Sequence, residues 1–219
     1  MKKLVIFDFD GTIADSMWTW DALGRETLEE KGLSPLLDYE SVIRTMSVPD
    51  FSRFLAEKYP SLSPADELMA QWHNKMVYNY LNRVGLKEGI VEFLEHLKKS
   101  GVTVYLASAT RYDVLIQAVK HFGLEKYFDY ILTEECVGAT KREPKIYLMC
   151  AQRAGCNLED VYLFEDAAHA VKTAKSIGIK VCALSDYSMR AHVDEIKATA
   201  DMYIDDFTNI EGLKKFIEE

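Results

Sequence analysis

Residues 4–12, LVIFDFDGT, give the clearest indication of how this chain folds. Four consecutive apolar residues lead directly into two aspartates and a glycine. A short apolar run without polar alternation is typical of a strand buried on both faces of a parallel sheet. Gly11 permits a tight turn where the chain leaves the strand. Asp8 and Asp10, two residues apart, are expected to face one cavity while Phe9 points into the core.

Four more apolar runs of this kind follow, at residues 102–107, 129–132, 161–164 and 181–184. Between them lie stretches with helical character, at residues 89–99, 113–122, 144–154 and 167–177. Strands that alternate with helices are typical of a parallel sheet covered by helices on both faces. The sequence therefore predicts an α/β fold with a Rossmann-like, doubly wound parallel sheet.

Residues 16–82 differ from the rest, because they hold four of the five prolines and all three tryptophans. Residues 17–31 form an amphipathic stretch that Gly32 ends, and Ser63-Pro64 is typical of an N-cap with proline at the first helical position. Apolar residues then recur at helical spacing from Leu68 onward. We expect a core domain of residues 1–15 and 83–219 and an inserted helical domain of residues 16–82, with about four helices.

The overall composition excludes several classes of protein. Apolar residues make up 48% and charged residues 28%, as in globular chains. The net charge of −9 leaves no basic excess for binding nucleic acid, and no apolar run is long enough to cross a bilayer. The four cysteines form no C-x-x-C pair, and we expect them to be reduced and partly buried in a cytoplasmic protein. A monomer is favoured.

Polar side chains follow three of the predicted strands at the point where each strand ends. Asp8 follows the first strand, Ser108 follows residues 102–107, and Glu165-Asp166 follow residues 161–164. In an open parallel sheet, ligands bind beyond the carboxyl ends of the strands. The sequence therefore predicts that these side chains converge on one functional site.

Four carboxylates, those of Asp8, Asp10, Glu165 and Asp166, would crowd this edge of the sheet. Buried acids need a cation or a hydrogen-bond network to compensate them. One lysine cannot offset four acids, whereas a divalent cation with oxygen ligands can. The carboxylate donors favour Mg²⁺ over zinc.

Two weaker signals complete the site. Ser108, with the backbone N–H of Ala109, can hold anionic oxygens, although serine at a strand end is also a common cap for the following helix. Lys141, in the loop before the helix at residues 144–154, can bring an ammonium group to the sheet edge. Two alternatives stay open. Lys141 is an ordinary surface lysine, or the neighbouring Lys145 supplies the ammonium group instead.

These elements, in this order, resemble the haloacid dehalogenase (HAD) superfamily of phosphohydrolases. The resemblance runs from Asp8 to about residue 179, and the helical insert lies where members with a helical cap place it. The length and the stretch from Asp8 to Ser16 resemble the phosphoglycolate phosphatase and β-phosphoglucomutase branch. Arg142, where the superfamily usually has proline, and Ala167, where it usually has serine, depart from the pattern and leave the precise branch open.

The resemblance implies a role for each matching residue. Asp8 would be the nucleophile that forms an aspartyl-phosphate, and Asp10 the general acid and base. Ser108, Ala109 and Lys141 would hold the transferring phosphoryl group.

The resemblance also implies a bound Mg²⁺. Asp8, the backbone carbonyl of Asp10 and Asp166 would be its ligands, with Glu165 contributing directly or through water. The substrate would be a small phosphorylated metabolite.

Two alternatives to a phosphatase stay open at this point. A phosphomutase would return the phosphoryl group to a sugar phosphate instead of transferring it to water. A non-catalytic phospho-acceptor module also uses clustered acids and a lysine, although the long helical insert disfavours it. Specificity is expected in the helical insert, where the residues of interest are Trp18, Trp20, Arg44, Ser47, Arg53, His73 and Lys75.

Overall fold

The computed structural model describes residues 3–35, 46 and 48–218. The chain divides into two compact units, one made of Met1–Asp15 and Val84–Glu219 and the other of Ser16–Arg83. The described residues include no helix that is both long and apolar enough to cross a membrane.

The first unit is built around a six-stranded sheet with the order β5-β4-β1-β6-β7-β8, in which every pair of neighbours is parallel. The strands are β1 (Leu4–Phe7), β4 (Thr103–Ser108), β5 (Tyr130–Thr133), β6 (Val161–Glu165), β7 (Lys180–Leu184) and β8 (Met202–Ile204). Two short strands, β2 (Ala14–Asp15) and β3 (Gly85–Leu86), form a separate antiparallel pair.

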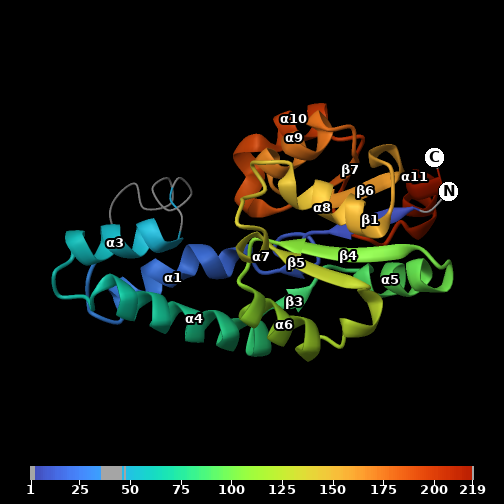
Figure 1. Cartoon of the computed structure of the whole chain (residues 1–219). Helices are drawn as coiled ribbons and strands as arrows, with labels where there is room; N and C mark the ends of the chain where they lie inside the picture. Colours follow the sequence, from blue (N-terminus) through green and yellow to red (C-terminus); the bar gives the residue numbers. More distant parts are fainter. Residues whose placement is uncertain (1–2, 36–45, 47, 219) are drawn as a thin grey trace. The chain divides into compact units, whose positions relative to one another are not determined.

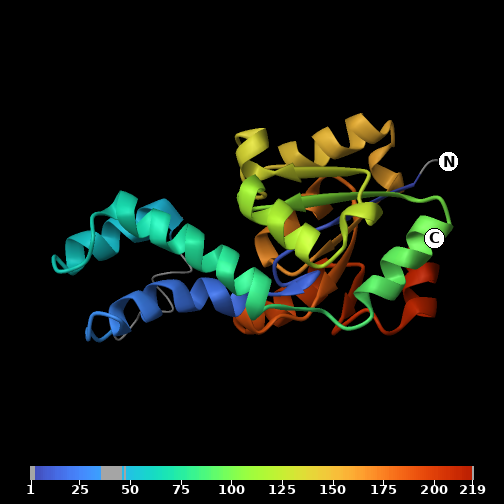
Figure 2. The ribbon, with the colours of Figure 1, turned by 90° about the horizontal axis from the view of Figure 1, so that it is seen from below.

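Helices cover both faces of this sheet (Figures 1 and 2). One face carries α5 (Ile90–Lys99), α6 (Tyr112–His121) and α11 (Ile210–Glu218). The other carries α8 (Lys145–Ala154), α9 (Ala168–Ser176) and α10 (Val193–Thr199). Short helical segments complete the unit: α7 (Glu134–Val137) and the 3₁₀ turns at Glu125–Tyr127, Leu158–Asp160 and Tyr187–His192. The prediction of an α/β fold with a doubly wound parallel sheet is confirmed.

The two faces of the sheet bury different side chains. Phe7 of β1 stacks on Phe164 of β6 with ring centroids 4.7 Å apart, and both rings contact Phe93 of α5 and Phe207. The opposite face packs mainly aliphatic side chains, among them Leu4 and Ile6, against α8, α9 and α10. Every side chain of β1 is fully buried, which is why its sequence shows no polar alternation.

The order of the strands determines where a ligand can bind. From β1 the chain proceeds outward to β4 and β5, and then returns to place β6 on the other side of β1. The carboxyl ends of β1 and β6 therefore lie at the point where the winding reverses. In open parallel sheets this switch point leaves a crevice for a ligand.

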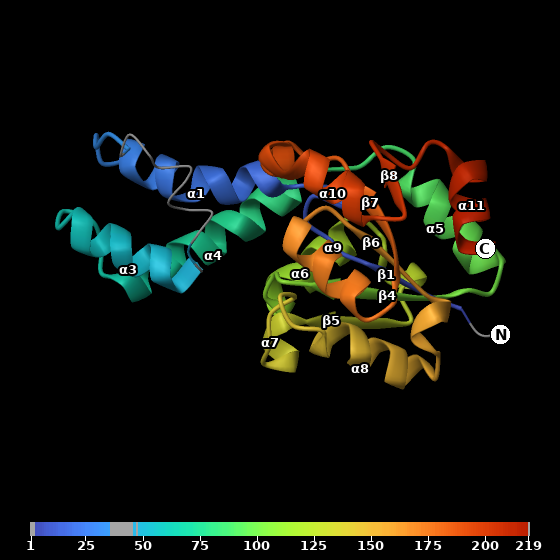
Figure 3. The same ribbon diagram turned by 90° about the horizontal axis from the view of Figure 1, so that it is seen from above.

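The second unit contains three helices among its described residues: α1 (Met17–Glu29), α3 (Val48–Lys58) and α4 (Ala65–Asn82) (Figure 3). Trp72 of α4 stacks on Phe51 of α3 at 5.5 Å, and its indole N–H donates to the hydroxyl of Thr27 in α1 at 2.9 Å. These contacts join the three helices around buried aromatic rings.

Two expected helix boundaries in this unit were wrong by one or two residues. The first helix ends at Glu29 rather than at residue 31. The helix predicted to begin at Pro64 begins at Ala65, because Pro64 takes the extended N-cap conformation, with ψ of 155°, outside the helical region. Arg44 and Ser47, two of the residues of interest for specificity, lie outside the described residues.

Candidate active site

Three acidic side chains converge at the carboxyl ends of β1 and β6. Asp8 directly follows β1, Glu165 is the last residue of β6, and Asp166 comes next. The three residues are 5%, 1% and 2% exposed, and a carboxylate oxygen of each lies within 4.8 Å of the others. The backbone N–H of Asp8 donates to the carbonyl of Phe164 at 2.9 Å, which extends the β1–β6 ladder into the site.

Lys141 is the cation of this cluster. Its Nζ donates to Asp8 Oδ1 and, at 2.7 Å, to Glu165 Oε2, and the residue is only 3% exposed. The Lys141 backbone N–H donates to Glu134 Oε1 at 2.6 Å, so Glu134 helps to hold the loop that carries the lysine. Lys145, the alternative, donates to the carbonyl of Val137 at 2.8 Å instead. The structure therefore places Lys141 in contact with the acids.

The charges of the cluster do not balance, because three buried carboxylates share one ammonium group. Burial and the neighbouring charge of Glu165 raise the pKa of Asp8 well above its usual range, against the opposing effect of Lys141. Burial, together with the charges of Glu165 and Asp8, raises the pKa of Asp166 in the same way. Burial alone would lower the pKa of Lys141, but the adjacent carboxylates outweigh it and the pKa is raised. A further positive charge would stabilise this arrangement.

The donor atoms fit a divalent cation. Both oxygens of Glu165 are engaged, one by Lys141 and the other by the backbone N–H of Ala167 at 3.1 Å. Asp166 Oδ2 is buried and, among the described residues, has no hydrogen-bond partner. A buried carboxylate oxygen without a partner is costly unless a ligand satisfies it. Carboxylate oxygens are also the ligands that Mg²⁺ takes in proteins.

The loop after β1 is shaped around Asp166. Gly11 has a φ of +78°, and a Cβ at this position would come within 2.5 Å of Asp166 Oδ2. The loop is closed by backbone hydrogen bonds from Gly11 to Ala14 at 2.8 Å and from Ala14 to Phe9 at 2.9 Å. Phe9 is fully buried, in agreement with the sequence-based expectation. Only glycine combines this conformation with such a close approach.

Asp10 lies beside the carboxyl end of β4. Its Oδ2 accepts a hydrogen bond of 2.5 Å from the hydroxyl of Thr110. The backbone N–H of Thr110 in turn donates to Ser108 Oγ at 3.0 Å, with Ala109 between them in the turn. The N-cap of α6 is Arg111, not Ser108. Ser108 therefore stabilises the turn that brings Thr110 to Asp10, rather than capping the helix.

Several residues near these acids were not predicted from the sequence. Asp186 follows β7, is 8% exposed, and its Oδ2 pairs with Lys87 Nζ at 3.2 Å. Its charge contributes to the raised pKa of Asp166. Asp186 lies two residues beyond the apolar run at residues 181–184, as Asp166 lies two residues beyond the run at residues 161–164, so the strand-end rule applied to this fifth run would have indicated it. Thr12 and Thr110 lie within the predicted motifs, but neither was predicted to have a role. The Thr12 hydroxyl donates to Asp166 Oδ1 at 3.4 Å, and the Thr110 hydroxyl donates to Asp10.

The residues expected to influence specificity lie in the helical unit, and several have partners there. Trp18 lies under the guanidinium of Arg83 at 4.7 Å. Lys75 pairs with Glu30 at 2.8 Å, and the exposed Arg53 pairs with a neighbouring aspartate. These contacts stabilise the helical unit itself.

Comparison with known proteins identifies the family. The model of the haloacid dehalogenase-like hydrolases matches residues 5–184. The chain belongs to the haloacid dehalogenase-like hydrolase family. Among relatives of this HAD chain, the "Phosphorylated carbohydrates phosphatase" of Thermotoga maritima is 33% identical over 185 residues, which cover 81% of this chain and 82% of the relative. The "Fructose-1-phosphate phosphatase YqaB" of Escherichia coli is 26% identical, and the match covers 80% of this chain and 92% of YqaB.

Solved structures share the HAD fold over nearly the whole chain. A "putative beta-phosphoglucomutase" from Thermotoga maritima superposes with a TM-score of 0.81 at 24% identity, covering 98% of this chain and 99% of its own. A "predicted phosphoglycolate phosphatase" from Haemophilus somnus gives 0.79 at 19% identity, covering 97% and 98%. The predicted HAD membership is thus confirmed. So is the prediction of an enzyme, a HAD-type phosphoric monoester hydrolase.

Proposed function

We propose that this enzyme is a magnesium-dependent phosphatase that hydrolyses a small phosphomonoester through an aspartyl-phosphate intermediate. The observation that supports the proposal best is the buried cluster of Asp8, Lys141, Glu165 and Asp166 at the switch point of the sheet. Phosphoryl transfer depends on positioning and on neutralising charge, and this cluster supplies both.

In this proposal Asp8 is the nucleophile. A carboxylate oxygen of Asp8 bonds to phosphorus as the bond from phosphorus to the ester oxygen breaks. The ammonium of Lys141 holds the carboxylate in one orientation, and the hydrogen bond from the backbone N–H of Asp8 to the carbonyl of Phe164 holds the backbone that carries it. Water then attacks the phosphorus, phosphate leaves, and the carboxylate of Asp8 is restored.

Asp10 acts as the general acid and base. It donates a proton to the departing alkoxide and later accepts one from the attacking water. The 2.5 Å hydrogen bond from Thr110 orients its carboxyl group for both steps. Ser108, the backbone N–H of Ala109 and the ammonium of Lys141 hold the phosphoryl oxygens.

Asp8, Asp166 and the backbone carbonyl of Asp10 would hold Mg²⁺, with Glu165 contributing through water because both of its oxygens are already engaged. Bound Mg²⁺ would supply positive charge to the phosphoryl group and to the crowded carboxylates.

The substrate class is that of a small phosphorylated metabolite. Two relatives are named as phosphatases of phosphorylated carbohydrates and of fructose 1-phosphate, which supports this size class. We also propose that residues 16–82 serve as a specificity cap for the core of residues 1–15 and 83–219. We further propose that the enzyme is a monomer in the cytoplasm and that its four cysteines are reduced.

The test compares Asp8→Asn and Asp10→Asn with Asp194→Asn, an exposed aspartate in the first turn of α10. Each variant is assayed with an aryl phosphate and with an alkyl phosphate, with Mg²⁺ and after chelation. Asp8→Asn and chelation should each abolish release of phosphate from both esters. Asp10→Asn should lower kcat/KM for the alkyl ester far more than for the aryl ester, because kcat/KM does not include the later attack of water and only the alkoxide needs a proton to leave.

Activity that survives Asp8→Asn would exclude Asp8 as the nucleophile, and equal losses of kcat/KM on the two esters would exclude the acid role of Asp10. Interconversion of hexose phosphates without release of phosphate would show a phosphomutase instead. The Asp194→Asn variant should behave like the wild type in every assay.

A further inference from the structure

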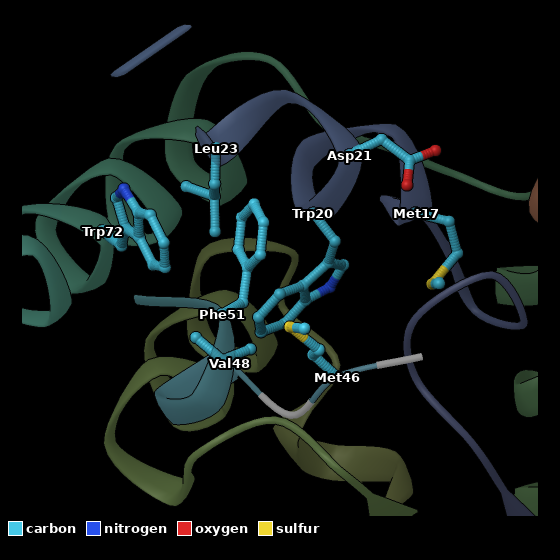
Figure 4. Close-up of a pocket in the computed structure, with 8 residues that line it drawn as sticks. All are labelled: Met17, Trp20, Asp21, Leu23, Met46, Val48, Phe51 and Trp72. Atoms are coloured by element: carbon cyan, nitrogen blue, oxygen red, sulfur yellow. The ribbon is translucent and has the colours of Figure 1, made fainter. Parts of the chain in front are cut away.

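The helical unit contains a cavity of about 190 Å³. Figure 4 shows Trp20, Phe51 and Trp72 among the residues that line it. Among the described lining residues only Asp21 is charged, and the indole N–H of Trp72 already donates to Thr27. The described lining therefore supplies mainly carbon surface and no cation for a phosphate group.

A second buried ion pair lies at the edge of the sheet that carries the acidic site. Asp186 follows β7, and its Oδ2 accepts a hydrogen bond of 3.2 Å from Lys87 Nζ. The side chains of Asp186 and Lys87 are only 4% and 14% exposed. The parallel neighbours β6 and β7 pair Glu165 with Ala183, so Asp166 and Asp186 both come just beyond this paired position. The ion pair therefore lies one strand away from Asp166, at the same edge.

Lys87 fixes the position of Asp186. Its Nζ also donates to the carbonyl of Ser185 at 3.1 Å, while Asp186 Oδ1 accepts from the backbone N–H of Ser188 at 2.9 Å. The backbone N–H of Lys87 donates to the carbonyl of Ile13, in the loop after β1, at 2.8 Å. Lys87 thus links the loop after β1 to the segment after β7, and both carboxylate oxygens of Asp186 are held in place.

Asp186 acts on Asp166 through its charge. Burial and the charges of Glu165 and Asp8 raise the pKa of Asp166, and the charge of Asp186 adds to this effect. Because both oxygens of Asp186 are already engaged, charge rather than ligation is what Asp186 can offer to a cation held by Asp166. Lys87 carries the opposite charge, so the two members of the pair have opposing effects on any ion bound at the site.

We propose that Lys87 is a positioning residue of the acidic site, whose ammonium group holds Asp186 beside Asp166 and offsets the charge of Asp186. The pair then sets the balance between two affinities of the site. Asp186 increases the affinity for a divalent cation, and Lys87 increases the affinity for phosphate. This inference rests on the proposed function, because it takes Mg²⁺ and phosphate as the ligands of the site.

The test measures the binding of Mg²⁺ alone, and of inorganic phosphate with Mg²⁺ present, by calorimetric titration. Low ionic strength is used, because charges are then least screened. One unit charge changes the affinity for a divalent ion about fourfold across about 10 Å of a water-like medium. Asp186→Asn should therefore bind Mg²⁺ about fourfold more weakly, and Lys87→Met about fourfold more tightly. Phosphate should respond in the opposite sense, with tighter binding to Asp186→Asn and weaker binding to Lys87→Met.

The opposite signs distinguish an effect of charge from damage to the structure, which would weaken the binding of both ligands in both variants. Lys87→Arg keeps the positive charge and should bind Mg²⁺ like the wild type. The double variant, Lys87→Met with Asp186→Asn, leaves neither charge buried alone, so it serves if Lys87→Met does not fold. Its affinity for Mg²⁺ should be about fourfold higher than that of Asp186→Asn and close to that of the wild type.

The matched control is an ion pair at the opposite end of β7. Lys175 Nζ donates to Asp201 Oδ1 at 2.7 Å, and Asp201 Oδ2 accepts from the backbone N–H of Val181 at 2.7 Å. This pair, like the first, combines a lysine with an aspartate that accepts from a backbone N–H. Lys175→Met and Asp201→Asn should leave the affinities for Mg²⁺ and phosphate unchanged.

The outcomes separate this inference from the proposed function. Shifts of Mg²⁺ affinity in the same direction for Asp186→Asn and Lys87→Met, or no shift in either, would overturn the role of the pair even in an active phosphatase. Equal shifts in the control variants would also overturn it, because net charge alone would then explain them. Opposite shifts in a protein that releases no phosphate from any ester would support the pair and reject the phosphatase. A wild-type protein that binds no Mg²⁺ would reject both.

Discussion

Replacement of Gly11 by alanine tests whether the loop after β1 is built around the carboxylate of Asp166. The backbone at Gly11 has a φ of +78°, and an added Cβ would meet Asp166 Oδ2 at 2.5 Å. Ordinary van der Waals contact begins at 3.4 Å, so the two atoms would be 0.9 Å too close. Asp166 is buried, and either it or the loop has to move.

The expected effect of Gly11→Ala has two parts, a loss of folding free energy and a loss of catalytic rate. Alanine in the left-handed region costs about 1–2 kcal/mol of folding free energy relative to glycine. Displacing a catalytic group by about 1 Å can cost about 100-fold in rate. Gly11→Ala should therefore lose about 1–2 kcal/mol of stability and about 100-fold in kcat/KM on an aryl phosphate, and it should bind Mg²⁺ more weakly.

Gly178→Ala is the matched control, because Gly178 has a φ of +85° and a Cβ there would meet no atom within 4 Å. Urea denaturation, initial rates and calorimetric titration with Mg²⁺ would be measured for both variants. Gly178→Ala should lose a similar stability and keep its activity and metal affinity. If Gly11→Ala kept the activity and metal affinity of this control, the packing of the loop against Asp166 would have no functional role.

Two further predictions concern groups around the site. Tyr147→Phe should leave the free energy of unfolding unchanged or raise it by about 1 kcal/mol, because the buried Tyr147 hydroxyl has no hydrogen-bond partner among the described residues. In urea denaturation Tyr127→Phe, which removes a 2.6 Å hydrogen bond to Glu95, should instead lose about 1 kcal/mol. Burial lowers the pKa of His169 below its usual 6.5, so the unfolded chain binds the proton more tightly. Wild-type stability should therefore fall, relative to His169→Asn, as the pH drops below about 6.5.

Either of two results would contradict these predictions. A loss of stability in Tyr147→Phe equal to that in Tyr127→Phe would show that the Tyr147 hydroxyl has a partner, such as a buried water. Parallel stability curves for the wild type and His169→Asn between pH 7 and pH 5 would show that His169 titrates alike in the folded and unfolded chains.

Local sequence was sufficient to predict the strands that are buried on both faces of the sheet. Residues 4–7 and 161–164 are continuous apolar runs because helices cover both sides of the sheet at these strands. The strand β8 was missed, since its apolar run is only three residues long and all three are half-buried at the edge of the sheet. Asp8 and Glu165 could be assigned to one site because parallel strands bring their carboxyl ends to the same edge.

The fold class, the family and the acids at the strand ends could thus be predicted from the amino-acid sequence, because apolar periodicity and short motifs are local properties. The folded chain was needed to show that Lys141 rather than Lys145 contacts Asp8, and that Asp166 keeps a buried oxygen without a hydrogen-bond partner among the described residues. It also brought Thr110 to Asp10 and Asp186 towards Asp166. These pairings depend on the order of strands in the sheet and on the exclusion of water, and spacing along the chain encodes neither.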